Sequence, residues 1–219
     1  MKVSHFLSDH RPYIVGQTLV WNILTQARGP MPQRSSNNAF EAHESIDSYV
    51  LRMKSILEHI THLCQRYDIK HIFLQEAPSD REILADSLQE MLASFGHDVF
   101  IHQCKSSPQL LTLSLEPLEI EYCDEHDRQV LYATKDGRLL AHVHCSFSRI
   151  RDNLPVYCER WQGWLDQGAS IMGDFNMPLT DIPVHAWTWS GLPSQFGSID
   201  GVLAPGAQRV CDLAEVNCW

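Results

Sequence analysis

Apolar residues recur at intervals of three and four along residues 46–67, and this spacing predicts a long amphipathic helix with one polar face. A second helix is predicted over 79–95, with Ser79 as its N-cap and Glu82 as the capping-box partner of Ser79. A third helix is predicted over 155–166. The segments between the three predicted helices lack this spacing of three and four.

Shorter apolar runs predict β-strands between and around these helices. The sequence Lys135-Asp136-Gly137-Arg138 predicts a tight hairpin, because Asp-Gly supplies the positive φ angles that a primed turn requires. Strands and long helices without an internal repeat favour one layered α/β or α+β domain over residues 1–219. The predicted strands cover 12–15, 18–22, 71–74, 99–102, 110–115, 129–134, 139–144, 169–172, 199–203 and 209–216.

Composition narrows the class of protein. With 219 residues, 44% of them hydrophobic, the chain is long enough for one substantial core. No apolar run approaches the roughly 20 residues that cross a bilayer, and the first residues lack a signal-peptide pattern, so we expect a soluble, cytoplasmic protein without an integral membrane segment. Seven cysteines without C-x-x-C spacing argue against a disulfide framework or a zinc ribbon. The net charge of −10 argues against tight, non-specific DNA binding, but it does not exclude catalysis on a phosphodiester.

Polar residues stand at the ends of several predicted strands, where a strand holds a side chain rigidly at the edge of a sheet. Taken singly, each of these residues is more often a cap or a turn residue. Asp174 and Asn176 are more specific, because Gly173 allows a tight turn and a spacing of two puts both side chains on one face of an extended chain. The five segments are Trp21-Asn22, Gln75-Glu76, His142-Val143-His144, Gly173-Asp174-Phe175-Asn176 and Ser198-Ile199-Asp200.

Together with Ser8-Asp9-His10-Arg11-Pro12, these segments resemble the motifs of the endonuclease/exonuclease/phosphatase superfamily, which has the DNase I-like fold. The resemblance implies an α+β, four-layer α/β/β/α sandwich of two packed sheets flanked by helices. In that family the S-D-H-x-P motif comes last, whereas here it precedes all the others. The order of motifs therefore predicts a circular permutant, in which Gly16-Gln17 joins what are the last and first strands in the family. The rival interpretation is a chance S-D-H-R-P in a truncated chain.

The resemblance also implies a divalent cation, with Mg²⁺ as the first choice and Mn²⁺ as an alternative. Glu76 is the first choice of metal ligand, with Asn22 and Asp9 beside it.

The remaining motif residues are predicted to act on the phosphate and on the attacking water. His10 would be the general base or a phosphate contact, oriented by Asp200. Asp174 would position or deprotonate the water, while Asn176 and His144 would hold phosphate oxygens. Whether Asp174 or His10 takes the proton stays open.

Two departures from the family pattern are Gly201 after the strand Asp and His142 in place of an Asn. The motifs predict an enzyme that hydrolyses a phosphodiester, with DNA or RNA as the expected substrate. Trp187 and Trp189, expected in a loop, could stack on bases, although such residues more often belong to the core. The alternatives are a phosphatase of phosphoinositides or other small molecules, and a catalytically inactive binding module. The sequence does not predict an oligomeric state.

Overall fold

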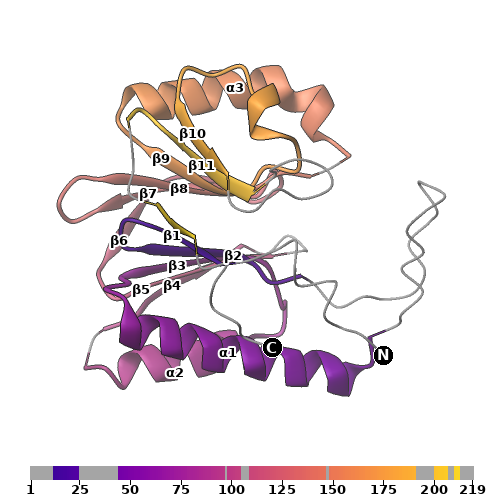
Figure 1. Ribbon diagram of the computed structural model, residues 1–219, viewed down its shortest axis with the longest axis vertical. Helices are drawn as coiled ribbons and strands as arrows, with labels where there is room; N and C mark the ends of the chain where they lie inside the picture. The colour runs from indigo at the N-terminus through magenta and orange to yellow at the C-terminus, as the bar shows by residue number, and fades with distance from the viewer. Residues whose placement is uncertain are drawn as a thin grey trace.

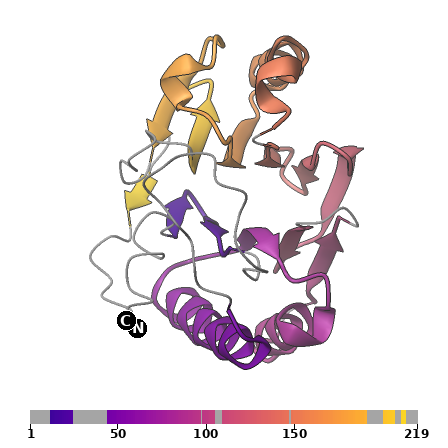
Figure 2. The same ribbon diagram turned by 90° about the vertical axis from the view of Figure 1, so that its right-hand side faces the viewer.

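The computed structural model describes residues 12–24, 44–96, 98–104, 109–146, 148–190, 200–206 and 210–212. These residues form four layers (Figures 1 and 2). Helices α1 (Ile46–Arg66) and α2 (Ala85–Ala93) cover one sheet, and helix α3 (Ile150–Asp166) covers the other. The two sheets pack against each other in the middle, so the predicted α/β/β/α sandwich is confirmed.

Each sheet has six strands. The first has the order β12-β1-β2-β3-β5-β4, and the second has the order β10-β11-β9-β8-β7-β6. The strands of the first sheet are β1 (Tyr13–Val15), β2 (Thr18–Asn22), β3 (His71–Ala77), β4 (Phe100–Gln103), β5 (Gln109–Ser114) and β12 (Val210–Asp212). Those of the second are β6 (Leu118–Asp124), β7 (Gln129–Thr134), β8 (Leu139–His144), β9 (Ser170–Asp174), β10 (Trp187–Ser190) and β11 (Asp200–Ala204).

One pair of strands in each sheet is parallel, and all other pairs are antiparallel. Strand β2 runs parallel to β3, and α1 connects them; β8 runs parallel to β9, and α3 connects them. Parallel neighbours carry their carboxyl ends to the same edge of a sheet, where α/β folds commonly place their ligands. The polar residues that end these four strands are therefore brought together by the fold.

The central strands are continuous runs of apolar residues because both faces of each sheet are buried. In β2, Leu19 and Trp21 belong to the core under α1, while the intervening Val20 belongs to the core between the sheets. In β9, Ile171 packs under α3 and Met172 packs between the sheets. These alternating side chains fix the register of the strands, because a slip of one residue would exchange the two cores.

Most predicted elements are confirmed, and strands β2, β7 and β8 have the predicted bounds. Helix α1 ends one residue earlier than predicted, with Ser45 as its N-cap. Among the described residues no helix is both long and apolar enough to span a bilayer. Of the predicted last strand, only 210–212 lie within the described residues.

The predicted capping box at 79–82 is wrong. Asp80 provides the cap, because its carboxylate accepts a hydrogen bond of 3.1 Å from the amide of Glu82. This cap begins a single 3₁₀ turn, Arg81–Ile83, and Leu84 then leaves helical geometry with φ −146° before α2 begins. Because Leu84 is completely buried, the break lets an apolar side chain enter the core at the cost of helix continuity.

Three further expectations need correction. Helix α3 starts five residues before Pro155, at Ile150, so the proline lies inside the helix. Trp187 and Trp189 lie in strand β10 and not in a loop. Strand β6 was not expected; six of its seven residues, Glu119 to Asp124, are exposed or half-buried and include three acidic residues, so its apolar signal is weak.

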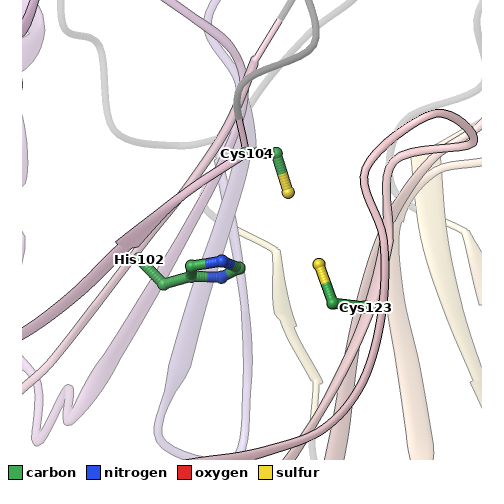
Figure 3. Close-up of side chains that lie close together, drawn as sticks. All are labelled: His102, Cys104 and Cys123. Atoms are coloured by element: carbon green, nitrogen blue, oxygen red, sulfur yellow. The ribbon is translucent and has the colours of Figure 1, made fainter.

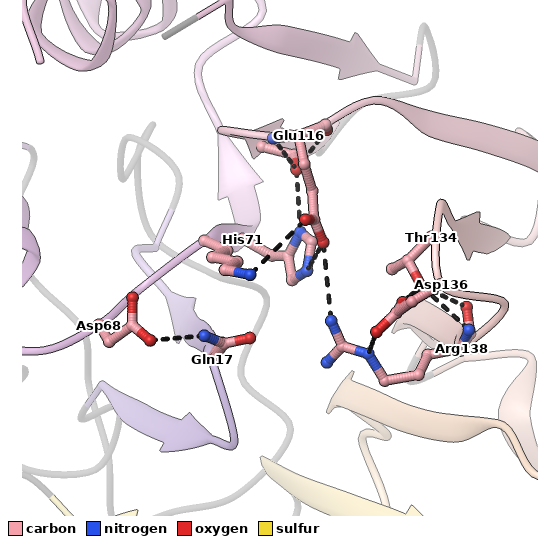
Figure 4. A network of polar contacts seen from close by, with 9 residues as sticks. Gln17, Asp68, His71, Glu116, Thr134, Asp136 and Arg138 are labelled. Atoms are coloured by element: carbon pink, nitrogen blue, oxygen red, sulfur yellow. Dashed lines mark hydrogen bonds and ion pairs between the residues drawn. The ribbon is translucent and has the colours of Figure 1, made fainter. Parts of the chain in front are cut away.

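A network of polar contacts joins the two sheets near the start of β3 (Figure 4). Glu116 lies 3.3 Å from Nε2 of His71 and 3.6 Å from Arg138, which follows the β7–β8 turn. Nδ1 of His71 lies 2.9 Å from the hydroxyl of Ser114. These contacts connect β3 and β5 of the first sheet to the β7–β8 hairpin of the second. These contacts lie at the amino end of β3, at the opposite end of the strand from Glu76.

Candidate active site

Four polar side chains meet at the carboxyl ends of the parallel strands: Asn22 of β2, Glu76 of β3, His144 of β8 and Asp174 of β9. One ligand atom from each of Glu76, His144 and Asp174 lies within 4.8 Å of the other two. His144 Nε2 is 3.8 Å from Glu76 Oε1 and 3.7 Å from Asp174 Oδ2. Residues from both sheets therefore build one compact cluster.

The backbone at Glu76 is strained in a way that positions its side chain. Glu76 has φ +58°, a conformation uncommon for residues other than glycine. The pairing of β3 with β5 also shifts register between Leu74 and Ala77, which marks a β-bulge around Glu76. Bulges re-aim side chains and are frequent beside active sites. Strand β3 runs three residues past its predicted bound, to Ala77, so Glu76 lies inside the strand near the end where the sequence placed it.

The buried carboxylate of Asp174, 2% exposed, is held by three donors. Its Oδ1 accepts a hydrogen bond of 2.7 Å from the amide N–H of Asn176. Its Oδ2 accepts one of 2.9 Å from Asn22 Nδ2 and one of 3.1 Å from Asn176 Nδ2. A buried charge is stable only when hydrogen-bond donors replace the lost water, and these three N–H donors also fix the orientation of the carboxylate.

Both asparagines direct their amide N–H groups at protein acceptors. Asn22 Nδ2 lies 3.4 Å from Glu76 Oε1 as well as close to Asp174, while its Oδ1 accepts a hydrogen bond from the amide of Leu24. Asn176, with φ +52°, also donates to the carbonyl of Cys145 at 2.7 Å. For Asn22 to act as a metal ligand, its amide would have to turn so that Oδ1 replaced Nδ2. For Asn176 to hold a phosphate, one of its N–H groups would have to leave its present acceptor.

Gly173 allows β8 and β9 to approach closely beside this cluster. It has φ +138°, and a Cβ atom at this position would lie 2.0 Å from the carbonyl oxygen of Val143. Val143 is its register partner in β8, and the next pair along these strands is His144 with Asp174. The glycine is therefore required for the spacing that places His144 beside Asp174.

Asp200 and Tyr13 extend the cluster. Asp200 is the register partner of Asp174 across β11 and β9, so the predicted strand aspartate lies at this edge. Tyr13, which the sequence analysis did not select, donates a hydrogen bond of 2.7 Å to the carbonyl of Gly201 and accepts one of 3.2 Å from the amide of Gly173. Burial, and then the charge of Asp200, raise the pKa of Tyr13 well above its usual range, so the hydroxyl keeps its proton. Tyr13 thus ties β1 of the first sheet to β9 and β11 of the second.

Tyr13→Phe is expected to lower the free energy of unfolding by about 1–3 kcal/mol, because it leaves two buried backbone groups without their hydrogen-bond partner. Urea unfolding followed by circular dichroism would measure this change. The matched control is Tyr122→Phe, whose half-buried hydroxyl makes one long contact of 3.4 Å with Asp124, so a change within about 0.5 kcal/mol is expected. Equal effects of the two substitutions would contradict the bridging role of Tyr13.

A buried cation lies next to the acidic cluster. Arg128 is 8% exposed, and its Nε donates a hydrogen bond of 3.1 Å to the carbonyl of His144. Burial lowers the pKa of Arg128, while the charges of Cys145, Glu76 and Asp174 oppose that shift. The sequence offered no signal for Arg128, because it precedes a strand and belongs to no motif. Its guanidinium supplies a fixed positive charge beside two carboxylates.

His142 is a core residue and not a member of the cluster. Its ring is fully buried, stacks on Phe73 at 4.5 Å, and lies between Gln75 Nε2 at 2.6 Å and Thr112 Oγ1 at 2.9 Å. Gln75 Nε2 also donates to the carbonyl of Phe73, so an N–H group of Gln75 faces His142 Nε2. Burial, and then the neighbouring His144, lower the pKa of His142 well below its usual range. The ring is therefore neutral, with its proton on Nδ1.

This neutral histidine predicts a dependence of stability on pH. The pKa of His142 is depressed by folding, so below about pH 6.5 the unfolded chain binds a proton that the folded chain does not, and stability falls by up to about 1.4 kcal/mol per pH unit. His142→Asn is expected to reduce the slope of unfolding free energy against pH between 6.5 and 5 by about one proton. Denaturant unfolding across this pH range would measure the slope. The exposed His62, replaced in the same way, is the control, and an unchanged slope in His142→Asn would contradict the prediction.

The donor set at this edge suits a hard divalent cation. Glu76 and Asp174 supply two carboxylates, and Asn22 supplies an amide oxygen if its side chain turns, which are the oxygen donors that Mg²⁺ and Mn²⁺ prefer. His144 adds one imidazole nitrogen to the same cluster.

Two predicted site residues, Asp9 and His10, lie outside the described residues. Their roles remain predictions. The strand that follows their motif is nevertheless described: β1 pairs on one side with β2, through the turn at Gly16-Gln17, and on the other side with β12.

No family model and no curated protein sequence matches the chain. Solved structures similar to it include one of the endonuclease/exonuclease/phosphatase class, from Bacteroides vulgatus, with 10% identity and a TM-score of 0.47, covering 74% of this chain and 83% of that one. Another is an AP endonuclease from Archaeoglobus fulgidus, with 17% identity and a TM-score of 0.43, covering 62% of this chain. The present chain spans only 57% of that endonuclease. A third is the 3′ phosphatase NExo from Neisseria, bound to a product DNA hairpin, with 14% identity and a TM-score of 0.48, covering 68% of this chain and 80% of that one.

Proposed function

We propose that this chain is a divalent-metal-dependent phosphoesterase of the endonuclease/exonuclease/phosphatase superfamily, and that it hydrolyses a phosphodiester bond in DNA or RNA. The observation that carries the proposal is the convergence of Glu76, His144 and Asp174 within 4.8 Å at the carboxyl ends of three strands. Each of these residues belongs to a different motif of the family. Motifs that are 68 and 30 positions apart in the chain thus meet at one point, as a shared active site requires.

The proposed chemistry assigns each side chain a task. A bound Mg²⁺ would neutralise the negative charge that grows on the phosphate during hydrolysis. Glu76 would hold that ion, with Asn22 and Asp9 beside it. Asp174, already fixed by its three hydrogen bonds, would orient the attacking water.

The other groups would hold the phosphate and move a proton. His144 and Asn176 would donate to phosphate oxygens, with His144 within reach of both carboxylates. His10, oriented by Asp200, would be the second candidate to take the proton from the water.

We further propose that the chain is a circular permutant with a single catalytic domain. The pairing of β1 with β2 supports this, because β1 directly follows the Ser8-Asp9-His10 motif and β2 ends on Asn22. The motif would then enter the same edge of the first sheet as Asn22 and Glu76. The hairpin at Gly16-Gln17, where Gly16 has φ +59°, would join the family's last strand to its first.

The test is Mg²⁺-dependent hydrolysis of single-stranded DNA, double-stranded DNA, RNA and a phosphoinositide panel by the wild type, by His10→Ala and by the control His62→Ala. We expect activity on a nucleic acid, a loss of roughly 10²–10⁴-fold in His10→Ala, and no loss in the control. Circular dichroism would establish that both variants are folded.

Each other outcome has a definite meaning. Activity only on phosphoinositides would replace the nuclease with a small-molecule phosphatase of the same site. A fully active His10→Ala would show that the N-terminal motif is a coincidence and would overturn the permutation. Mg²⁺ binding by a wild type that hydrolyses none of these substrates would favour a binding module.

A further inference from the structure

A second group of ligating side chains lies away from the candidate active site (Figure 3). One ring nitrogen of His102 and the sulfurs of Cys104 and Cys123 all lie within 4.8 Å of one another. His102 belongs to β4, Cys104 directly follows β4, and Cys123 belongs to β6. Strand β4 is the edge of the first sheet and β6 is the edge of the second, so the cluster bridges the two sheets at their margins.

A chain of hydrogen bonds through the core orients the imidazole of His102. An N–H group of Gln75 faces His142 Nε2, so His142 donates from Nδ1 to Thr112 Oγ1, which also accepts a bond of 3.0 Å from the hydroxyl of Tyr132. That hydroxyl has therefore used its proton, and at 2.7 Å from His102 Nδ1 it acts as the acceptor. His102 thus carries its proton on Nδ1, and Nε2 keeps a free lone pair. Metal-binding histidines are commonly oriented in this way, with the second ring N–H donated to a fixed acceptor.

The burial of the three groups fits a site that opens to solvent on one side. Cys104 is completely buried, His102 is half-buried and Cys123 is exposed. The negative charge of Glu125 acts on both cysteines and favours a cation at this place.

The chemistry of two sulfurs and one imidazole selects the ion. Thiolate and imidazole suit Zn²⁺, whereas Mg²⁺ prefers the oxygen donors of the other cluster. In a tetrahedral zinc site with bonds of about 2.0–2.3 Å, neighbouring ligand atoms are roughly 3.5–4 Å apart. Because the three ligand atoms already lie within 4.8 Å of one another, the cluster would need to contract by no more than about 1 Å to reach this spacing.

We propose that His102, Cys104 and Cys123 bind one Zn²⁺ ion, with a fourth position open to water or to an exogenous ligand. The ion links the edge strands of the two sheets, and it is separate from the oxygen-rich site of the proposed phosphoesterase. Two of the ligands lie in edge strands and the third directly follows one, so the ion would link the margins of the two sheets.

The test uses the full chain, reduced with a phosphine and freed of metal, and titrated with Co²⁺ and then with Zn²⁺. Co²⁺ bound by thiolates gives an intense near-ultraviolet charge-transfer absorption, which Zn²⁺ should then abolish by displacement. We expect one equivalent of Co²⁺ to give this absorption, and Cys123→Ser to weaken binding by more than the roughly 10- to 100-fold that loss of an outer-sphere partner costs. Cys123 is the variant of choice because its exposed side chain makes little contribution to the core.

Controls separate this site from others in the chain. Cys64→Ser changes a cysteine on α1 outside the cluster and should leave the titration unchanged, as should Glu76→Gln. Zn²⁺ should raise the thermal midpoint of the wild type and of Cys64→Ser, but not that of Cys123→Ser. Absence of the charge-transfer band, or its persistence at full strength in Cys123→Ser, would overturn the proposal.

Discussion

Glu76→Gln is expected to reduce the proposed Mg²⁺-dependent hydrolysis by roughly 100- to 1,000-fold while leaving the fold intact. A catalytic metal ion contributes several kcal/mol to stabilising the charge of the transition state, and each 1.36 kcal/mol corresponds to a factor of ten in rate. Glutamine keeps the size of the side chain and removes the charge that would hold the ion. The substitution therefore removes one interaction without creating a cavity.

The same variant makes a second prediction that does not depend on knowing the substrate. In the ion-free chain Glu76 and Asp174 bring two like charges within 4.8 Å, so removing one of them should leave thermal stability unchanged or raised. A bound ligand stabilises the folded state in proportion to its affinity, so Mg²⁺ should raise the thermal midpoint of the wild type but not of Glu76→Gln. Thermal unfolding with and without Mg²⁺ would measure both effects.

Glu82→Gln is the matched control for charge. Glu82 is exposed on the 3₁₀ turn before α2, outside the cluster, so we expect wild-type activity and a wild-type response to Mg²⁺. If Glu76→Gln kept the Mg²⁺-induced rise in thermal midpoint, the ion would have to bind elsewhere, and the assignment of Glu76 as its ligand would be wrong.

The second large effect is expected from Gly173→Ala, which should destabilise the fold by roughly 3–5 kcal/mol. Two costs combine: an alanine at φ +138° is strained by about 1–3 kcal/mol, and a Cβ placed 2.0 Å from the Val143 carbonyl must force two strands apart. The Val143 carbonyl oxygen is a backbone atom held in the β8–β9 pairing, so no side chain can move aside to accommodate the methyl group.

Gly163→Ala is the matched control, and its effect should have the opposite sign. Gly163 lies inside α3, and a Cβ atom there would meet nothing within 4 Å. Alanine should therefore stabilise that helix by about 0.5–1 kcal/mol. Urea unfolding of both variants would measure the difference, and a Gly173→Ala protein within 1 kcal/mol of the wild type would show that β8 and β9 can separate at low cost.

Sequence reasoning placed a residue correctly where its position depends on its own strand. Asn22, His144 and Asp174 end strands whose apolar patterns were readable, and the parallel pairing then brings these ends together. The motifs could be selected because the polar residue follows directly on a buried run. The same logic placed Glu76 at the correct edge, although it could not show the bulge and the positive φ angle that aim its side chain.

The unpredicted parts depend on partners that are distant in the chain. Tyr13 binds backbone groups of residues that are 160 and 188 positions away, and no local pattern encodes such a contact. The early start of α3 was missed because a proline usually marks a first turn. Here Pro155 and Arg151 are both exposed, so the carbonyl that loses its helical donor can bind water.

The order of the strands shows that the two sheets are topological repeats of each other, although the sequence has no visible repeat. In the first sheet, a hairpin (β1–β2) leads through a helix to a parallel strand (β3) and then to a second hairpin (β4–β5); the second sheet repeats this with β7–β8, α3, β9 and β10–β11. The outer strands β12 and β6 pair with β1 and β7 in the same way. Asn22 and His144 therefore occupy equivalent positions, as do their register partners Gln75 and Asp174, and Glu76 follows Gln75 directly. The cluster is a junction of two half-sites, with Asn22 and Glu76 from the first sheet and His144 and Asp174 from the second. The proposed activity therefore needs both sheets, and neither half of the chain is expected to show it when separated from the other.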